Sequence, residues 1–167
     1  MGVDITGLTE LKAKFDDLSS NAKDRAVRKA LQAGAEIEKA AIEYRAPERV
    51  DLPSGTALPP GALRADITVK IKRSDQGNLH AVIEPGDLTH HVALWVEEGH
   101  RLVRGGYSKE IYRHGEATGK FRGPGTEIAT VEAHPFVRPA FEETRTEVEQ
   151  AIATTLSQEI EKASKAK

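Results

Sequence analysis

The sequence predicts an α+β fold in which a small antiparallel sheet packs against a long N-terminal helix and a C-terminal helix ends the chain. Three observations support this prediction. Apolar residues recur at helical spacing over residues 8–44, two alternating segments lie between residues 65 and 84, and a second helical pattern runs from residue 140. The 167 residues are enough for one compact domain with a modest core. We therefore expect a single domain over residues 1–167, with long loops at about 46–62 and 99–126.

The N-terminal segment carries one apolar stripe whose members lie three or four residues apart. A polar break at residues 19–21 leaves open whether this segment forms one helix or two. The stripe includes the small residues Ala30, Gly34 and Ala41, which permit a neighbouring backbone to approach closely. Packing on the chain's own sheet and contact with another subunit both fit this stripe.

A loop and a β-hairpin are predicted to follow. Residues 46–60 contain four prolines and no periodicity, which is typical of a loop. In the next segment Ile67, Val69 and Ile71 alternate with polar residues, as in a strand with one apolar face. Turn-forming residues at 74–78 precede a second strand at 79–84, so the two strands are expected to pair with one side facing solvent.

The middle of the chain is less regular. Residues 92–96 form an apolar run that is too short for periodicity to separate helix from strand. Residues 99–125 are rich in glycine and read as an extended loop, and residues 127–131 fit a further strand. This loop is the one basic segment of the chain; its basic residues are Arg101, Arg104, Lys109, Arg113, Lys120 and Arg122.

Two prolines mark the start of the last helix. Pro135 and Pro139 restrict the backbone on both sides of Phe136, and Pro139 has the φ angle of a first helical residue. These prolines predict that the chain enters the helix along a fixed path. Arg138 is expected to pair with a carboxylate. The expected core anchors are Trp95, Phe136 and Phe141.

Composition excludes several classes of protein. The formal net charge of −2 argues against a dedicated nucleic-acid binder, and the absence of cysteine excludes disulfides and thiolate metal sites. No apolar run is long enough to span a membrane, and the N-terminus lacks the pattern of a signal peptide. Gly2 and Thr6 fit a myristoylation pattern only loosely. We expect synthesis in a cytoplasm.

No set of side chains has the spacing of a catalytic or metal site. The densest histidine group is His90, His91 and His100 with Glu97, but adjacent histidines do not converge on one ion from a helix or a strand. The carboxylates between residues 84 and 98 fit ion pairs better than acid–base catalysis. Residues 115–121 lack the spacing and the hydroxyl of a phosphate loop. We therefore expect no enzyme, no cofactor and no resident metal.

Three short motifs, in this order, resemble the tail-component family of HK-type siphophages, which comprises tail-completion, neck or head–tail joining proteins. An Ala-Pro at 46–47 precedes Gly-Ala-Leu-Arg-Ala-Asp-Ile at 61–67, Trp-Val-Glu-Glu-Gly follows at 95–99, and Pro-Phe-Val-Arg-Pro-Ala-Phe lies at 135–141. Residues 48–60 and 99–134 are longer than the family pattern. The motif residues are Gly61, Leu63, Arg64, Trp95, Glu97, Gly99, Pro135, Phe136, Arg138, Pro139 and Phe141.

The resemblance implies a structural protein of the virion, made in the host bacterial cytoplasm. Such a protein is expected at the head–tail junction or the tail terminus, as an oligomeric ring through which DNA passes, with a hexamer as the expected ring. Its partners would be other copies of itself and neighbouring neck and tail proteins, with non-specific contact to the genome and neither membrane nor small-molecule substrate. The basic residues of the 99–125 segment would then face the channel or a neighbouring subunit; a solvated surface loop is the alternative.

Two other hypotheses stay open at this point. A cellular adaptor could bind nucleic acid or protein through the same basic loop, because phosphate contacts need only positive charge. The second of these hypotheses is a metal-dependent hydrolase whose metal is bound by the histidines. Neither the ring number nor the position along the neck follows from the sequence.

Overall fold

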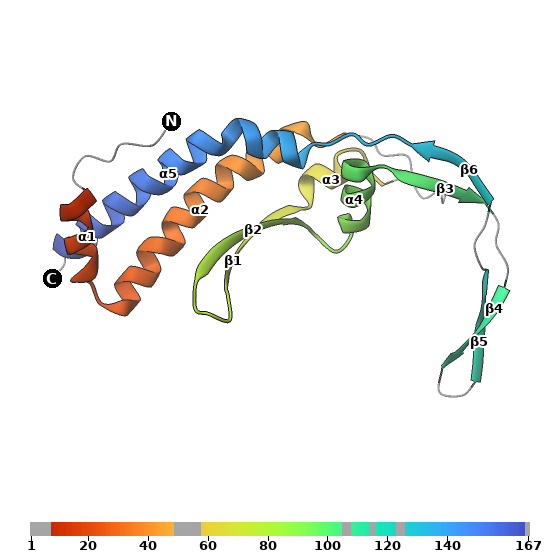
Figure 1. Ribbon diagram of the computed structural model, residues 1–167, viewed down its shortest axis with the longest axis horizontal. Coiled ribbons are helices and arrows are strands. Elements are labelled where there is room, and N and C mark those ends of the chain that lie inside the picture. Colours follow the sequence, from red (N-terminus) through yellow and green to blue (C-terminus); the bar gives the residue numbers. More distant parts are fainter. Residues whose placement is uncertain (1–7, 49–57, 105–107, 114–115, 123–125, 166–167) are drawn as a thin grey trace.

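The computed structural model describes residues 8–48, 58–104, 108–113, 116–122 and 126–165, and the fold is α+β as predicted. Figure 1 shows an elongated molecule with two long helices at one end and thin β-ribbons at the other. The helices are α1 (Leu8–Asp16), α2 (Ser20–Arg45), α3 (Ala62–Ala65), α4 (His90–Glu98) and α5 (Val137–Lys165). The strands are β1 (Ile67–Arg73), β2 (Leu79–Pro85), β3 (His100–Arg104), β4 (Ser108–Arg113), β5 (Glu116–Arg122) and β6 (Thr126–Val131). None of the helices in these ranges is long and apolar enough to cross a membrane.

The polar break divides the N-terminal segment into two helices. Ser19 is the N-cap of α2, and its side-chain oxygen accepts a hydrogen bond from the backbone N–H of Ala22 at 3.4 Å. This bond satisfies one of the N–H groups that have no partner within the helix. The chain can therefore turn sharply between α1 and α2.

The helices α2 and α5 lie side by side and antiparallel (Figure 1). Gly34 sits at a close approach of the two helices, because a Cβ atom there would come within 2.6 Å of Ile152 Cγ1 and 3.1 Å of Val148 Cγ1. The small residues of the stripe thus admit a neighbouring helix of the same chain. Ion pairs of Lys29 with Glu159, at 2.6 Å, and of Arg45 with Glu143 connect the two helices.

The strands β1 and β2 form the predicted hairpin, in register from Ile67 opposite Pro85 to Arg73 opposite Leu79. Only the base of the hairpin is buried, at Ile67. Towards its tip the hairpin curves away from the helices (Figure 1), although Arg73 still pairs with Asp24 of α2. The base of the hairpin is thus packed in the core, and the ion pair of Arg73 with Asp24 ties its far end to α2.

The prediction of a loop over residues 99–126 is wrong. The strands β3 and β6 pair antiparallel, and β4 pairs with β5 further along, with irregularities after Leu102 and Ile111. We call residues 100–131 the ribbon, and β4–β5 its outer ladder. Most of the glycines that suggested a loop lie between the strands in the sequence, and the polar residues within the strands hide the alternation. In the described ranges every sheet has two strands.

The core lies where α2, α3, β1, α4 and the start of α5 meet. Its buried members are Ile42, Ala46, Leu63, Ile67, Ala93, Phe136 and Ala140. Phe136 is 3% exposed, which confirms one of the three expected anchors. The other two expectations are wrong, since Trp95 is 38% exposed and Phe141 is 51% exposed. The residues that α4 and α5 bury instead are Val92, Ala93, Ala140 and Ile160.

Candidate functional site

The first motif forms the turn that closes the loop after α2. Gly61 has a φ angle of 78°, in the left-handed region that glycine adopts without strain, and its N–H donates to the carbonyl of Glu48 at 2.7 Å. Leu63 is buried in the core, and Arg64 Nε donates to the carbonyl of Ala46 at 2.5 Å. The motif therefore joins the end of α2 to the start of the sheet. Residues 49–57, within the predicted loop, lie outside the described part of the chain.

The second motif caps the helix that the third motif begins. The carboxylate of Glu97, at the end of α4, accepts hydrogen bonds from the backbone N–H groups of Phe136 at 2.7 Å, Val137 at 3.0 Å and Arg138 at 3.2 Å. Pro139, which follows, has no N–H. One carboxylate thus satisfies the free donors at the start of α5, where the helix dipole also favours a negative charge.

The environment of Glu97 stabilises its ionised form. Partial burial alone would raise the pKa of Glu97, but the three backbone donors and the nearby positive charge of Arg138 together lower it below its usual value. Arg138 contacts the Glu97 carboxylate through its backbone N–H, and its guanidinium forms no ion pair with a described residue, so the expected side-chain pairing stays a prediction. The helix begins at Val137, so the prediction that Pro139 is the first helical residue is wrong by two positions. Proline is tolerated at the third helical position, because an N–H group there would have no acceptor within the helix.

Gly99 lies where the ribbon leaves the body of the molecule. Its φ angle is 74°, and a Cβ atom there would come within 2.7 Å of the carbonyl oxygen of Val131 and 2.9 Å of the nitrogen of Ala133. Next to it, the N–H of His134 donates to the carbonyl of Val96 at 2.7 Å. The two ends of the ribbon are therefore held together at this glycine. We call Leu63, Glu97, Gly99 and Phe136, with the contacts around them, the joint.

A second polar cluster, which the sequence did not reveal, supports the joint. Thr89 is fully buried, and its hydroxyl donates to the Asp66 carboxylate at 2.8 Å. The N–H of Gly86 donates to the carbonyl of Asp66 at 2.8 Å, and a Cβ atom at Gly86 would overlap the carboxylate. The cluster fixes the start of α4 against the start of β1. The turn residues at 85–87 were the only sequence signal for it.

A cleft, mostly apolar, opens beside the joint. One part measures about 560 Å³ and lies between β2, α4 and the first turn of α5; a second part of about 430 Å³ continues between β2, α2 and α5. Both parts are lined by Glu38, Ile83, Val137 and Phe141, so they form one continuous depression, which we call the cleft. Leu94 at its rim is 51% exposed, as is Phe141.

Glu38 is the unusual polar group of the cleft. Burial raises the pKa of its carboxyl group above the usual value, since removal from water disfavours the charge. Among the residues that the structure describes, Glu38 has no hydrogen-bond or ion-pair partner. The cleft therefore presents a partly desolvated carboxylate within an apolar surface.

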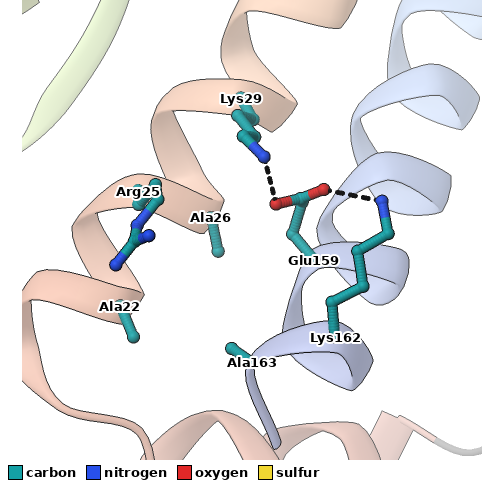
Figure 2. Close-up of a pocket in the computed structure, with 7 residues that line it drawn as sticks. All are labelled: Ala22, Arg25, Ala26, Lys29, Glu159, Lys162 and Ala163. Atoms are coloured by element: carbon teal, nitrogen blue, oxygen red, sulfur yellow. Dashed lines mark hydrogen bonds and ion pairs between the residues drawn. The ribbon is translucent and has the colours of Figure 1, made fainter. Parts of the chain in front are cut away.

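A third cavity, of about 340 Å³, lies between the first turns of α2 and the last turns of α5. Figure 2 shows Glu159 between Lys29 and Lys162. The carboxylate oxygens of Glu159 lie 2.6 Å from Lys29 Nζ and 2.9 Å from Lys162 Nζ. Its single carboxylate is thus already paired with two lysines, and we interpret the cavity as part of the contact between the two helices.

The histidines and carboxylates that were weighed as chemical groups do not assemble into a centre. In the described ranges no three potential metal ligands come together. Glu97 is engaged as a helix cap, and Glu84 is paired with Lys70 at 2.7 Å and Lys72 at 3.2 Å. The His100 ring lies against Trp95 with 5.3 Å between ring centres, and its two nitrogens are buried without a partner among the described residues.

The basic residues of the ribbon are distributed over β3, β4 and β5. Arg101 pairs with Glu127 of β6 at 3.5 Å in an exposed ion pair. The side chains of the other basic residues are outside the described part of the structure, so their orientation towards a channel or a neighbour stays a prediction. These residues are Arg104, Lys109, Arg113, Lys120 and Arg122.

Charge is unevenly distributed along the chain. Residues 100–131 contain six Lys and Arg against three Asp and Glu, a net charge of +3. The remainder contains 18 basic and 23 acidic residues, a net charge of −5. The ribbon and the body therefore have opposite signs, although the net charge of the whole chain is only −2.

The geometry defines a class of protein: an α+β body whose motif residues hold secondary structure together and in which the described residues form no reaction centre. Residues 9–99, more than half of the chain, match the family described as "Bacteriophage HK97-gp10, putative tail-component". The chain belongs to this family, which makes it a structural component of a phage tail and implies a place in the virion. Comparison with curated proteins and with solved structures gave no match. The matched residues include the first two motifs; the third lies beyond them.

Proposed function

We propose that the chain is a subunit of an oligomeric ring at the head–tail junction or the tail terminus, through which the genome passes. The ribbon is the observation that carries this proposal. Each of its strands has one hydrogen-bonded neighbour in the described ranges, so every strand keeps one open edge. Isolated two-stranded ladders are marginally stable in water. The ribbon is therefore a part of the fold that a neighbouring molecule would complete.

A ring follows from a simple geometric argument. A projection from one part of a subunit and its binding surface on another part make a head-to-tail contact, which closes into a ring when the rotation permits. The elongated shape in Figure 1 separates the ribbon from the long helices, so the two surfaces of such a contact would lie on different parts of each subunit. Partners of this ring would be neighbouring neck and tail proteins. The role is mechanical, with no catalysis, cofactor or small-molecule substrate.

Negative-stain microscopy of the purified protein, alone and mixed with the phage's tail tubes, tests this function. We expect rings with a central hole, and the same rings at one end of the tubes. Tubes incubated with a Phe136→Ala variant, which lacks the central anchor of the core, serve as the control and should carry none. A wild-type protein that stays monomeric and never joins particles or tails would contradict the proposal.

The positive charge of the ribbon also favours a second candidate, an adaptor that binds nucleic acid as a free monomer. Six basic residues could contact phosphates without sequence preference. An electrophoretic shift of duplex DNA by the monomer, lost between about 50 and 200 mM salt, is expected for this candidate. The ring hypothesis predicts little binding by the monomer, because the whole chain is acidic.

A further inference from the structure

We propose that the cleft binds the outer ladder of the ribbon from a second copy of this chain. The proposal rests on the ring described above and goes further, because it names the two surfaces that meet. The cleft is the receiving surface, lined by β2, α2, α4 and α5. The ladder formed by Ser108–Arg113 and Glu116–Arg122 is the occupant.

The cleft leaves large apolar side chains exposed to solvent that a protein interior would cover. Leu94 and Phe141 are each 51% exposed at its rim, and Ile83 and Val137 line both of its parts. A contiguous apolar surface of this kind typically marks an interaction site. Covering it would remove large apolar side chains from water, which favours association.

The carboxylate of Glu38 favours a positively charged occupant, although Arg138 and Glu97 also line one part of the cleft. It lines both parts of the cleft, is partly withdrawn from water and has no described partner. A cation that entered with the occupant would pair with it and offset the cost of that desolvation. The occupant is therefore expected to combine apolar residues with positive charge.

The outer ladder has this composition. Its sequence holds Ile111, Tyr112 and Phe121 as apolar residues, together with four basic residues: Lys109, Arg113, Lys120 and Arg122. The ribbon as a whole has a net charge of +3 against −5 for the remaining chain, so the ribbon and the body of another copy attract each other.

The ladder of one copy does not fill its own cleft in this structure. Figure 1 shows β3 and β6 leading away from the helices, with β4 and β5 at the far end of the molecule. Gly99 and the hydrogen bond from His134 to Val96 fix the direction in which the ribbon leaves. The contact that we propose is therefore made between molecules, and when it repeats head-to-tail it closes into a ring.

Photo-crosslinking of full-length protein tests the contact directly. A photoreactive phenylalanine analogue replaces Leu94 or Phe141, and an equal mixture of unlabelled and ¹⁵N-labelled protein is irradiated after assembly. Mass spectrometry should find crosslinks to residues 108–122 that join one light and one heavy chain. Tyr44, which is 83% exposed on α2 and does not line the cleft, is the matched control position and should give no such crosslink.

The outcomes separate this contact from the proposed function. Rings whose crosslinks join other segments would overturn the docking of the ladder and leave the ring intact. Crosslinks between the cleft and the ladder in assemblies that never join phage tails would support the contact and contradict the function. A protein that does not self-associate under any condition would overturn both.

A charge reversal gives an independent measurement. Glu38→Lys should weaken self-association by at least tenfold in sedimentation, whereas Glu147→Lys should change it less than twofold. Glu147 is an exposed residue of α5 that lines neither part of the cleft, so the two variants differ only in where the same charge is placed. Equal effects of the two variants would contradict the proposal. The crosslinking experiment keeps Glu38 intact and remains decisive if the lysine variant unfolds.

Discussion

At the joint, parts of α2, α3, β1, α4 and α5 share one buried cluster, whereas in the outer ladder each strand has a single neighbour in the described ranges. Glu97 at the joint supplies an acceptor for three backbone donors, and Gly99 leaves no room for a side chain. The ribbon has two-stranded ladders with open edges. This difference indicates that the joint stabilises the single chain, and that the ribbon is available for contacts with other molecules.

The largest effect on stability is expected at the centre of the joint. Phe136→Ala should lower the free energy of unfolding by about 3–5 kcal/mol, because it empties the core around a 3% exposed ring. Phe141→Ala, with a ring that is 51% exposed, should cost less than about 1.5 kcal/mol. Urea unfolding of both variants measures the contrast, and similar losses would show that the cleft is as closed as the core.

The glycine at the base of the ribbon comes next. Gly99→Ala should cost about 2–3 kcal/mol, since it combines a positive φ angle with overlap of the Val131 carbonyl. The matched control is Gly77→Ala in the β1–β2 turn, where φ is 84° but a Cβ atom meets nothing within 4 Å. That variant should cost about 1–2 kcal/mol for the backbone alone. If the two losses were equal, the close approach at Gly99 would contribute nothing.

The helix cap should have a smaller effect. Glu97→Gln keeps one acceptor oxygen and loses the charge, so it should cost about 1–2 kcal/mol at neutral pH. Glu98→Gln removes the same charge from an exposed neighbour and should change stability by less than about 0.5 kcal/mol. Thermal unfolding at pH 7 compares the two.

The effect of Glu97→Gln should depend on pH. The folded state lowers the pKa of Glu97, so its ionised form contributes stability above the unfolded value of about 4.3. That contribution is lost as the pH falls through the lower, folded value. The wild type and Glu97→Gln should therefore converge in stability in acid. A difference that stays constant down to the acid limit would show that the cap does not depend on the charge.

The smallest effect is expected in the ribbon. Lys120→Glu in β5 should change the unfolding free energy of the monomer by less than about 0.5 kcal/mol, because the outer ladder adds little to the stability of the single chain. Hydrogen exchange should show the same contrast, with amides of β4 and β5 exchanging much faster than those of α2 and α5. Strong protection of the ladder in a verified monomer would contradict the comparison.

The parts of the fold that depend on local patterns could be predicted from the sequence. The stripe around Gly34, the alternation at Ile67, Val69 and Ile71, and the turn at residues 74–78 identified the long helices and the first hairpin. Within the ribbon, the strand predicted at residues 127–131 is confirmed as β6. The other strands could not be predicted, because they carry charged residues and the glycines around them resemble those of a loop. The pairing of β3 with β6 also depends on partners that are distant along the chain.

For the site, the sequence identified the important residues, but it did not predict the role of each one. Leu63, Glu97, Gly99 and Phe136 all lie at the joint, but nothing in the pattern indicated that Glu97 accepts three bonds from the start of α5. Trp95 and Phe141 were assigned to the core from size alone. Burial depends on which face of α4 and α5 meets the body, and short apolar runs do not determine it.

The hydrogen bond between Gly61 and Glu48 has a practical consequence. It brings together the two ends of the segment that separates α2 from α3, so the body is fixed on both sides of that segment. The entropy of closing such a loop grows only with the logarithm of its length, about 0.6 kcal/mol for each doubling. Residues 49–57 are therefore the place to insert an epitope tag or a fluorescent reporter, with the joint and the ribbon left unchanged for locating this subunit within a phage particle.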